Sequence, residues 1–531
     1  DRSGVHPRRL EGEEPEQDPK ERVRHGPEEP EELDRAHAWD ATAGDEGLGS
    51  PKVGGRPRGQ GYPGPAMADR SRPNGGARLE IPPIATELGE RFRLAGHKLH
   101  LVGGVVRDLL LGRDHGDLDF ATDAVPRETT VVLRGWAERL YLVGVKFGTV
   151  GARRHDQVLE ITTFREEVYA EEHRKPSVTF GRDLRTDLSR RDFTVNAMAV
   201  RLPEGDLVDP FGGVKDLAAK RLDTPLDPEI AFSDDPLRML RAARFAAQLE
   251  LDPTQRVVRA IEQMHGRLAI VSAERISDEL SKLLLSDAPS RGLELVVETG
   301  LAEEFLPELS ALQLEQDPVH KHKDVLHHTF AVVEKCEANL TLRLAALLHD
   351  VGKPKTREIT PDGVSFHHHE VVGARMARER LQALRYPSHL VDDVAKLVEL
   401  HLRFHGYSEW SDSAVRRYVR DAGTLLDQLN QLTRADCTTQ NPFKAKKLEA
   451  LQEDLEERIA RLAEEENLGA MRPPLDGGQV MEHLGIEPGP TVGRALDHLM
   501  ELRLERGPID EDDAYRLLDE WWAAERDTSG D

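Results

Sequence analysis

A change of hydrophobic pattern near residue 215 constrains the fold of this chain more than any other feature. Between residues 81 and 215, short apolar runs alternate with amphipathic stretches. Residues 98–102 and 117–121 read as strands, and 148–152 with 158–162 predict a hairpin. After residue 215, almost every segment has helical periodicity. The pattern predicts an α+β fold, in which a small mixed-sheet head is followed by a long all-α region.

The 531 residues are enough for several domains, and changes of composition divide them into five parts. Residues 1–78 mix Gly, Pro, Glu and Arg and contain no Ile or Phe, so this tail is predicted to be disordered. The other parts are expected to be a head (79–215), a helical neck (216–300), a second helical domain (301–445) and a C-terminal helical region (446–531).

Charge and cysteine content exclude several classes of protein. A formal net charge of -25 argues against a protein that coats DNA, although it allows a local basic groove. The two cysteines, Cys336 and Cys437, support neither a disulfide scaffold nor a zinc finger. No apolar run is long enough to span a bilayer, and no secretion signal is found at the start. We therefore expect a cytoplasmic protein with no membrane or DNA partner.

Paired carboxylates after a glycine turn form the first candidate site. Gly103 and Gly104 follow a predicted strand and precede a predicted helix, where free backbone N–H groups can face a triphosphate. Asp117 and Asp119 are two apart in a strand, so both carboxylates project from one face and need a cation such as Mg²⁺. Glu160, between apolar neighbours on the later hairpin strand, is a candidate third carboxylate. A simple tight turn and a solvated strand face are the alternatives.

Three ordered blocks of sequence, 103–119, 190–199 and 234–245, strongly resemble signatures of the bacterial class II tRNA nucleotidyltransferase and poly(A) polymerase family. The first block contains the glycine turn and the aspartate pair, and the second begins with Arg-Arg-Asp. The third resembles the segment with which this family selects the nucleotide. The resemblance covers about residues 80–290 and continues less sharply to the C-terminus.

The resemblance implies catalysis by Asp117, Asp119 and Glu160 with Mg²⁺. Asp235 and Arg238 are three apart on a helix predicted to begin at Pro236, so an acceptor and a planar donor can meet the edge of a base together. Without the resemblance, a surface ion pair would be the better interpretation. The residues expected to bind the nucleotide are Gly103, Gly104, Arg107, Arg191, Asp192, Asp235, Arg238 and Arg241.

Histidines and aspartates with metal-ligand spacing form the second candidate site. The fragment 347–353, with His349 and Asp350 at the end of an apolar helix, resembles the HD metal-dependent phosphohydrolase superfamily. Neighbouring histidines leave each ligand uncertain by one residue, and a retired site with ordinary histidines is the alternative. The resemblance implies a first metal site of His328, His349, Asp350 and Asp436, with His369 and His401 near a second metal or a phosphate. The metal of this HD-like domain would be Mn²⁺, Ni²⁺ or Mg²⁺.

Together the resemblances imply a template-independent enzyme that adds CCA to tRNA 3′ ends from CTP and ATP and releases pyrophosphate. The expected partners are tRNA, CTP and ATP, and region 446–531 is expected to bind RNA. A phosphohydrolase activity of the HD-like domain is a further hypothesis. The alternatives are a poly(A) polymerase or an enzyme that adds only C or only A, a metal-dependent phosphohydrolase acting mainly on nucleotides or RNA ends, and a non-catalytic RNA-binding protein.

Overall fold

The computed structural model describes residues 79–114, 116–168, 177–181, 183–313, 324–360, 363–437, 441–466 and 471–529. The tail 1–78, which is predicted to be disordered, lies outside the described residues. Within the described part, no helix is both long and apolar enough to cross a membrane.

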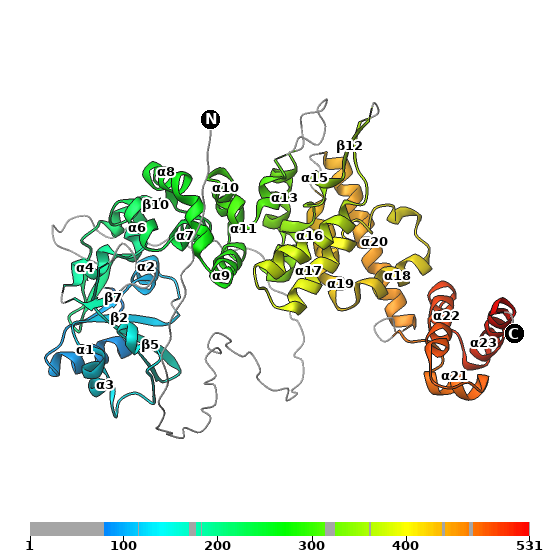
Figure 1. Cartoon of the computed structure of the whole chain (residues 1–531), viewed down its shortest axis with the longest axis horizontal. Coiled ribbons are helices and arrows are strands. Elements are labelled where there is room, and N and C mark those ends of the chain that lie inside the picture. The colour runs from blue at the N-terminus through cyan, green and yellow to red at the C-terminus, as the bar shows by residue number, and fades with distance from the viewer. Residues whose placement is uncertain are drawn as a thin grey trace, which may run out of the picture. The chain divides into compact units, whose positions relative to one another are not determined.

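The head contains a seven-stranded mixed sheet, which confirms the predicted fold class (Figure 1). The strand order is β3-β4-β5-β2-β1-β8-β9, in which β2 and β5 are parallel and all other neighbours are antiparallel. The strands are β1 (Leu99–Val102), β2 (Leu118–Thr122), β3 (Arg139–Tyr141), β4 (Thr149–Arg154), β5 (Gln157–Thr163), β8 (Ala199–Leu202) and β9 (Asp206–Val208).

The predicted hairpin is confirmed as β4 and β5. His155 and Asp156 connect these strands, and both have positive φ angles, of 48° and 61°. Two such residues give a turn whose twist matches that of the flanking strands, and polar residues tolerate this conformation best. A second hairpin, β6 (Arg165–Val168) with β7 (Ser177–Phe180), follows directly after β5.

The two faces of the sheet differ in how they are covered. Leu118 and Phe120 of β2 pack with Leu159 and Ile161 of β5 in one apolar cluster. The helices α1 (Pro83–Leu94), α2 (Gly104–Leu111) and α3 (Pro126–Leu133) contribute to the same cluster. Because side chains alternate along a strand, the residues between these apolar ones face the other side of the sheet. On that side the described residues form a small apolar cluster around Val102, Ala121 and Phe164, and polar groups occupy the rest of it.

From α5 (Gly213–Ala218) onward the described chain is mainly helical, as the sequence pattern predicts. The helices are α4 (Leu184–Ser189), still in the head, then α6 (Pro228–Asp234), α7 (Leu237–Leu249), α8 (Gln255–Met264), α9 (Ala273–Leu284), α10 (Pro289–Glu298), α11 (Leu301–Phe305), α12 (Pro307–Ser310), α13 (Val325–Lys335), α14 (Leu340–Leu348), α15 (Lys353–Thr356), α16 (His369–Ala383), α17 (Ser388–Leu400), α18 (Asp412–Ala422), α19 (Leu426–Asp436), α20 (Pro442–Glu466), α21 (Gly477–Leu484), α22 (Pro490–Arg506) and α23 (Glu511–Ser529).

Two short strand pairs interrupt this helical region, and the sequence pattern did not predict them. β10 (Arg221–Leu222) pairs in parallel with β11 (Asp252–Pro253), and β12 (Arg357–Thr360) pairs antiparallel with β13 (Gly363–Phe366). Local sequence did carry a signal for the second pair, since Ile359 and Thr360 on one side and Val364 and Phe366 on the other are strand-favouring residues that flank a Pro-Asp-Gly segment typical of turns.

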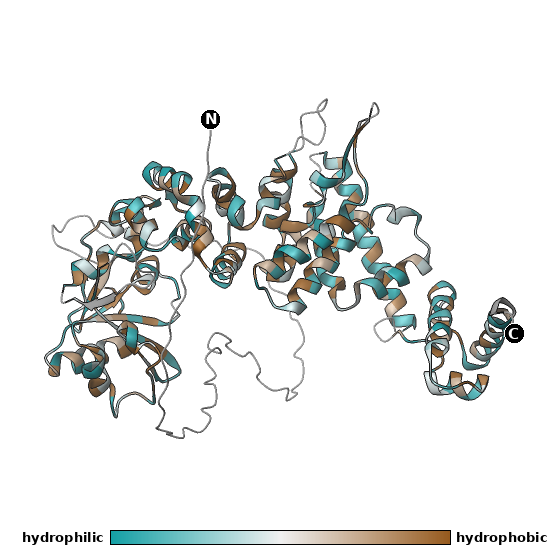
Figure 2. Ribbon diagram, in the orientation of Figure 1, coloured by the Kyte–Doolittle hydropathy of each residue, from teal (hydrophilic) through white to brown (hydrophobic). Residues whose placement is uncertain are grey.

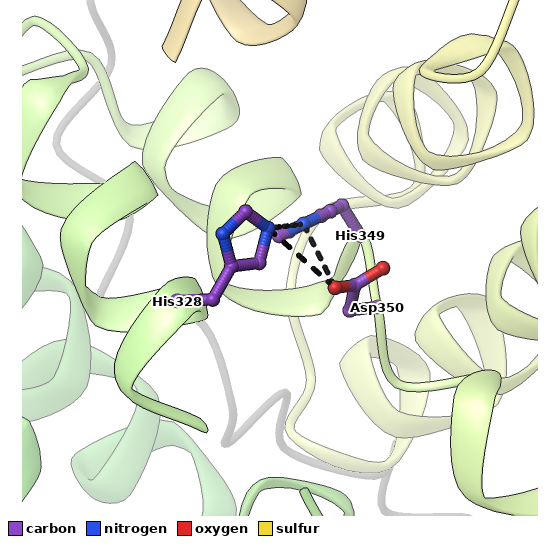
Figure 3. A group of neighbouring side chains, drawn as sticks. All are labelled: His328, His349 and Asp350. Atoms are coloured by element: carbon purple, nitrogen blue, oxygen red, sulfur yellow. Dashed lines mark hydrogen bonds and ion pairs between the residues drawn. The ribbon is translucent and has the colours of Figure 1, made fainter. Parts of the chain in front are cut away.

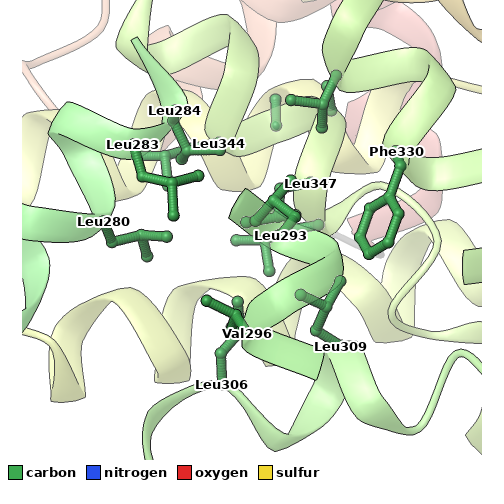
Figure 4. Close-up of a cluster of buried hydrophobic side chains, with 14 of the residues drawn as sticks. Leu280, Leu283, Leu284, Leu293, Val296, Leu306, Leu309, Phe330, Leu344 and Leu347 are labelled. Atoms are coloured by element: carbon green, nitrogen blue, oxygen red, sulfur yellow. The ribbon is translucent and has the colours of Figure 1, made fainter. Parts of the chain in front are cut away.

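Most helices in Figure 2 carry both brown and teal residues, as expected for helices that bury one side. The buried sides form one continuous cluster that reaches from Phe193 to Leu462. In its centre, α9 and α10 pack against α13 and α14 through Leu283, Leu293, Phe330 and Leu347, among others (Figure 4). Helices α21, α22 and α23 form a separate cluster.

Gly292 tests the packing between α10 and α7. A Cβ atom on this residue would lie 2.6 Å from the carbonyl oxygen of Ala243, which is backbone and cannot move aside. We expect Gly292→Ala to lower the free energy of unfolding by about 1–3 kcal/mol, as overpacking does in well-packed interiors. Thermal unfolding followed by circular dichroism would measure this.

Gly493→Ala in α22 is the matched control, because a Cβ atom there would have no neighbour within 4 Å. Its unfolding midpoint should stay the same or rise slightly, since alanine is the better helix former. Equal midpoints for both variants would contradict the close approach of α10 to α7.

Candidate functional site

The first candidate site is on the open face of the head sheet. Asp119 lies on β2 directly opposite Glu160 on the parallel strand β5. Asp117 immediately precedes β2, and both it and Glu160 are exposed, whereas Asp119 is half-buried. Burial raises the pKa of Asp119 to about 6; Arg191 opposes this shift, and Glu160 and Asp117 add to it. The carboxylates therefore repel one another, and a divalent cation would relieve that repulsion.

The glycine turn lies directly beside these carboxylates. Gly103 connects β1 to α2 with a φ of 80°, a conformation that favours glycine. A Cβ atom on Gly103 would lie 2.8 Å from Nη1 of Arg191 and 3.8 Å from Oδ2 of Asp119. The turn thus places the N-terminus of α2, which begins at Gly104, close to an arginine and to a carboxylate of the same site.

A pocket of about 350 Å³ joins this site to the other predicted blocks. Seven of the predicted residues line it: Asp119, Glu160, Arg191, Asp192, Asp235, Arg238 and Arg241. Gly103, Gly104, Arg107 and Asp117 are not among its lining residues. The side chain of Arg107 is buried, and its Nη1 donates a 2.7 Å hydrogen bond to Oδ1 of Asn196. Asn196 in turn donates to Asp192 at 3.0 Å, so Arg107 supports the pocket wall indirectly.

Asp192 is a buried carboxylate that lines the pocket and is held by several hydrogen bonds. Burial alone would raise the pKa of this carboxyl, but Arg241 and Asn196 outweigh the effect and lower the pKa to about 2. Arg241 donates from Nε to Oδ2 of Asp192 at 3.0 Å and from Nη1 to Glu279 at 3.2 Å. Glu279 also pairs with Arg244 at 2.7 Å. This network fixes the arginines of α7 relative to the second sequence block.

Asp235 and Arg238 line the same pocket, but the prediction that both are on one helix was wrong. Asp235 lies between α6 and α7 with an extended backbone, and its Oδ1 accepts a 3.2 Å hydrogen bond from the N–H of Leu237. The cause is Pro236, which disfavours helical geometry at the residue before it. Arg238 is in the first turn of α7, and its guanidinium donates to the carbonyl oxygens of Ala231 at 3.2 Å and Arg190 at 2.5 Å.

Several further polar residues line this pocket and were not assigned to it from the sequence: Thr162, Arg165, Asp187, Arg190 and Arg275. Arg190 belongs to the quoted second block, so its sequence signal was present. Arg165 and Arg275 carry no such signal, because a single arginine near a strand end or on a helix is common on any protein surface.

The second candidate site lies where four helix ends and one helix interior meet. His328 of α13 faces His349 and Asp350, which follow α14 directly (Figure 3). Nε2 of His328 is 3.3 Å from Nε2 of His349 and 2.9 Å from Oδ1 of Asp436, the last residue of α19. Oδ2 of Asp350 is 3.3 Å from Nε2 of His349. The four residues predicted for a first metal are therefore brought together.

His369 and His401 complete the cluster around the other oxygen of Asp350. His369 begins α16 and His401 follows α17. Nε2 of His369 is 3.4 Å from Oδ1 of Asp350, and ligand atoms of all three residues lie within 4.8 Å of one another. Asp350 thus belongs to both groups, as a carboxylate that bridges two cations would.

Hydrogen bonds orient the histidine rings toward the centre of this cluster. Nδ1 donates to a backbone carbonyl oxygen three residues earlier in His349 (2.8 Å), His369 (2.8 Å) and His401 (2.6 Å). In the neutral form of each ring, Nε2 therefore carries the lone pair that a metal needs. Nε2 of His369, Nε2 of His401 and Oδ1 of Asp350 are buried without a hydrogen-bond partner, which fits coordination of a metal.

The charges of this cluster also fit a metal. Burial lowers the pKa of His401 to about 3, so its ring is neutral. Burial would likewise lower the pKa of His349, but Asp350 and Asp436 outweigh it and raise the pKa to about 10. The buried carboxylate of Asp350 and the half-buried one of Asp436 would also attract a divalent ion bound among these residues.

The structure also distinguishes these histidines from their sequence neighbours. His327 is exposed and pairs with Asp324, while His367 and His368 are exposed. His328, His369 and His401 line a pocket of about 570 Å³, together with Lys353, which contacts Oδ2 of Asp350 at 2.6 Å. The alternative of ordinary solvated histidines thus describes His327, His367 and His368.

Comparison with protein families assigns three segments. Residues 99–223 match the family described as poly A polymerase head domain, and residues 250–312 match the probable RNA and SrmB-binding site of polymerase A. Residues 325–467 match the HD domain. The two candidate sites fall in the first and third of these segments, and Asp235 and Arg238 lie between the first and the second.

The match between this chain and three curated relatives covers most of the length of each relative. The chain is 34% identical to a CCA-adding enzyme of Anoxybacillus flavithermus, over 62% of this chain and 73% of the relative. It is 34% identical to a CC-adding tRNA nucleotidyltransferase of Thermus thermophilus, over 79% and 93%. It is 36% identical to an A-adding tRNA nucleotidyltransferase of Deinococcus radiodurans, over 80% and 95%.

A solved structure has the same fold. The crystal structure of the Bacillus stearothermophilus CCA-adding enzyme in complex with CTP superposes with a TM-score of 0.62. The two chains are 26% identical, and the match covers 84% of this chain and 98% of the other.

From the geometry of the histidine cluster we expect a metal to bind through His369 and not through the exposed His367. We expect His369→Ala to weaken binding of Mn²⁺ or Ni²⁺ by at least about tenfold, because one imidazole ligand is lost. Isothermal titration of the apo-protein would measure the change. His367→Ala, in the same run of histidines but exposed, should bind as the unmodified protein does. Equal weakening in both variants, or none in either, would contradict the assignment.

Proposed function

Because this chain belongs to the family of bacterial tRNA nucleotidyltransferases and poly(A) polymerases, we propose that it adds CCA to the 3′ end of tRNA from CTP and ATP, releasing pyrophosphate. The observation that carries the proposal is the pairing of Asp119 with Glu160 on adjacent parallel strands, beside an arginine-lined pocket that also contains Asp235 and Arg238. Carboxylates for a metal, cations for a triphosphate and a donor–acceptor pair for a base thus share one pocket.

We infer that Asp117, Asp119 and Glu160 hold Mg²⁺. The fit rests on oxygen ligands from neighbouring strands and on the raised pKa of Asp119, which reflects burial and like charges without a sufficient counterion. Mg²⁺ bound there would favour attack by the RNA 3′ hydroxyl on the α-phosphorus and balance the charge of the departing pyrophosphate. The carboxylates would hold the cation on the open face of the sheet.

The cationic part of the pocket suits the sugar and phosphates of the nucleotide. Arg191 lies against the glycine turn, where the first N–H groups of α2 are free of helical partners. We assign Gly103, Gly104, Arg191 and Asp192 to this part. Arg241 and Arg107 hold Asp192 and Asn196 in place, so we expect them to act by positioning these groups.

Asp235 and Arg238 suit the bases of CTP and ATP. Cytosine and adenine both present an amino donor beside a ring-nitrogen acceptor on the Watson–Crick edge. Uracil and guanine present a carbonyl acceptor beside an N–H donor. A carboxylate next to a guanidinium complements the first pattern and opposes the second. This protein template explains how C and A are selected without a nucleic-acid template.

CCA addition is favoured over the partial activities and over poly(A) synthesis. Support comes from the relatives named CCA-adding enzymes and from the similar structure of such an enzyme with CTP. The pocket contributes a physical reason, since its donor–acceptor pair suits C and A equally. The intact set of carboxylates also argues against a non-catalytic RNA-binding protein.

We propose that the chain is divided into the domains that the sequence pattern predicts. The head (79–215) and neck (216–300) would hold the nucleotide, 301–445 would be the HD-like domain, and 446–531 would bind tRNA. The separate apolar cluster supports a distinct unit of α21, α22 and α23, whereas α20 packs Leu455 and Leu462 into the main cluster. As for other tRNA-processing enzymes, we expect the cytoplasm as its location.

A second activity is favoured by the histidine cluster. We propose that His328, His349, Asp350 and Asp436 hold one metal, with His369 and His401 holding a second next to Asp350, as a phosphohydrolase of nucleotides or RNA ends. The buried and unpartnered Nε2 atoms of His369 and His401 support it. Imidazole ligands favour Mn²⁺ or Ni²⁺ over Mg²⁺ here, whereas the all-carboxylate site of the head favours Mg²⁺.

Asp119→Asn tests the proposed catalytic site. We expect nucleotide addition to fall by about 10²–10³-fold or more, because the charge that binds the cation is removed. Folding should be unaffected, since the change also removes a repulsion with Glu160. Incorporation of labelled CTP into tRNA lacking its 3′ end would measure the rate.

Asp156→Asn is the matched control for this variant. Its carboxylate is on the hairpin turn with 93% of the side chain exposed, and Asn is suited to its positive φ. It should retain the normal rate. A rate near normal for Asp119→Asn would rule out the assignment of the metal to these carboxylates.

The double variant His349→Ala with Asp350→Ala tests the second activity. It should lose Mn²⁺- or Ni²⁺-dependent hydrolysis of nucleotides and 2′,3′-cyclic phosphates and keep CCA addition, because different residues hold the two metals. Release of phosphate or opening of the cyclic phosphate would be measured. Hydrolysis that persists in the double variant, or is absent from the unmodified protein, would contradict a catalytic HD-like site.

A further inference from the structure

Helix α9 supports the base-reading segment from outside. Arg275 and Glu279 are one turn apart on α9 and therefore lie on the same side of it. Nη2 of Arg275 donates a 2.8 Å hydrogen bond to Oδ2 of Asp235. Glu279 contacts Arg241 and Arg244 of α7. A helix that is distant in sequence from Asp235 thus holds its carboxylate through Arg275.

The two base-reading groups are fixed in different ways. Arg238 is held by two backbone carbonyl oxygens, of Ala231 and Arg190. The carboxylate of Asp235 accepts one bond from the N–H of Leu237, which belongs to its own segment, and one from Arg275. In the described part of the chain, Arg275 is the one side chain that donates a hydrogen bond to this carboxylate.

The position of this carboxylate decides which bases fit. With Asp235 opposite the amino group and Arg238 opposite the ring nitrogen, cytosine and adenine are accepted. If the carboxylate is free to shift toward the ring nitrogen, it can accept the N–H of uracil or guanine while Arg238 donates to the carbonyl oxygen. Both groups would then be satisfied by the wrong bases, and discrimination would be lost.

We propose that Arg275 is a positioning residue that sets the discrimination against UTP and GTP by fixing the Asp235 carboxylate. The proposal rests on the proposed function, because it specifies how the same pocket excludes two nucleotides. Each oxygen of a carboxylate has two lone pairs, so Oδ2 can hold Arg275 and still accept from a base. Arg275 lines the pocket and is about half exposed, so it can keep this contact while a nucleotide enters.

If the ion pair between Arg275 and Asp235 only stabilised the fold, its loss would affect all four nucleotides alike. An ion pair this exposed contributes little to stability, so the loss of Arg275 should leave the fold intact. A defect in folding or in metal binding would lower the rates with all four nucleotides together. A shift of the carboxylate would instead change the ratio between them.

The experiment compares Arg275→Ala, Arg275→Lys and the control Lys282→Ala in the full chain. Lys282 is on the same helix, exposed, and pairs with Asp278 outside the pocket. For each variant, kcat/KM would be measured for CTP, ATP, UTP and GTP on tRNA transcripts ending before CCA and after CC. The unmodified chain should prefer CTP and ATP.

Discrimination against UTP and GTP should fall by about tenfold or more in Arg275→Ala and by less in Arg275→Lys, which keeps the charge but not the planar fork. Lys282→Ala should match the unmodified chain. Unchanged discrimination in Arg275→Ala, or an equal fall with all four nucleotides, would overturn the proposal. If the unmodified chain itself shows no preference for CTP and ATP, the proposed function fails, and this inference fails with it.

Discussion

The parallel pairing of β2 with β5 is the constraint on which the proposed active site depends. On each strand one carboxylate stands between two buried apolar side chains, so burying Leu118, Phe120, Leu159 and Ile161 on one face forces Asp119 onto the other, with Glu160 opposite it. A shift of one residue in register would bury the carboxylates and expose the core. Folding of the head therefore assembles the like charges that a divalent cation would balance, and the pocket is built around them.

Different structural elements position the ligand residues of the two candidate sites. The head uses the register of a sheet and an arginine network that connects Asp192 to α7 and α9. The helical region uses the ends of α14, α17 and α19, the start of α16 and the interior of α13, and carbonyl hydrogen bonds orient the rings of His349, His369 and His401. Oxygen ligands in the first and imidazoles in the second suit different metals, which is why two separable activities are proposed.

Local sequence patterns predicted much of this arrangement. The features that depend on contacts between distant segments could not be predicted from them. Alternation along one strand was enough to predict that Asp117 and Asp119 share a face, whereas the parallel pairing that sets Glu160 opposite Asp119 is a long-range contact. The HD-like ligand set came from the family resemblance, up to a choice between neighbouring histidines. Which of two neighbouring histidines faces the cluster depends on how α13 and α16 are rotated about their axes, and tertiary packing determines that rotation. The position of Asp235 outside the helix follows from Pro236, a signal that was present but misinterpreted. The contact from Arg275 spans two helices and has no local signal.

The most direct test of the account is the product formed on tRNA transcripts that lack CCA, incubated with Mg²⁺ and with CTP and ATP singly and together, then sequenced at the 3′ end. The protein should add two C residues with CTP alone, complete CCA when ATP is also present, and reject UTP and GTP. Addition that stops at CC in the presence of both nucleotides, addition of A alone, or a run of A residues would contradict it.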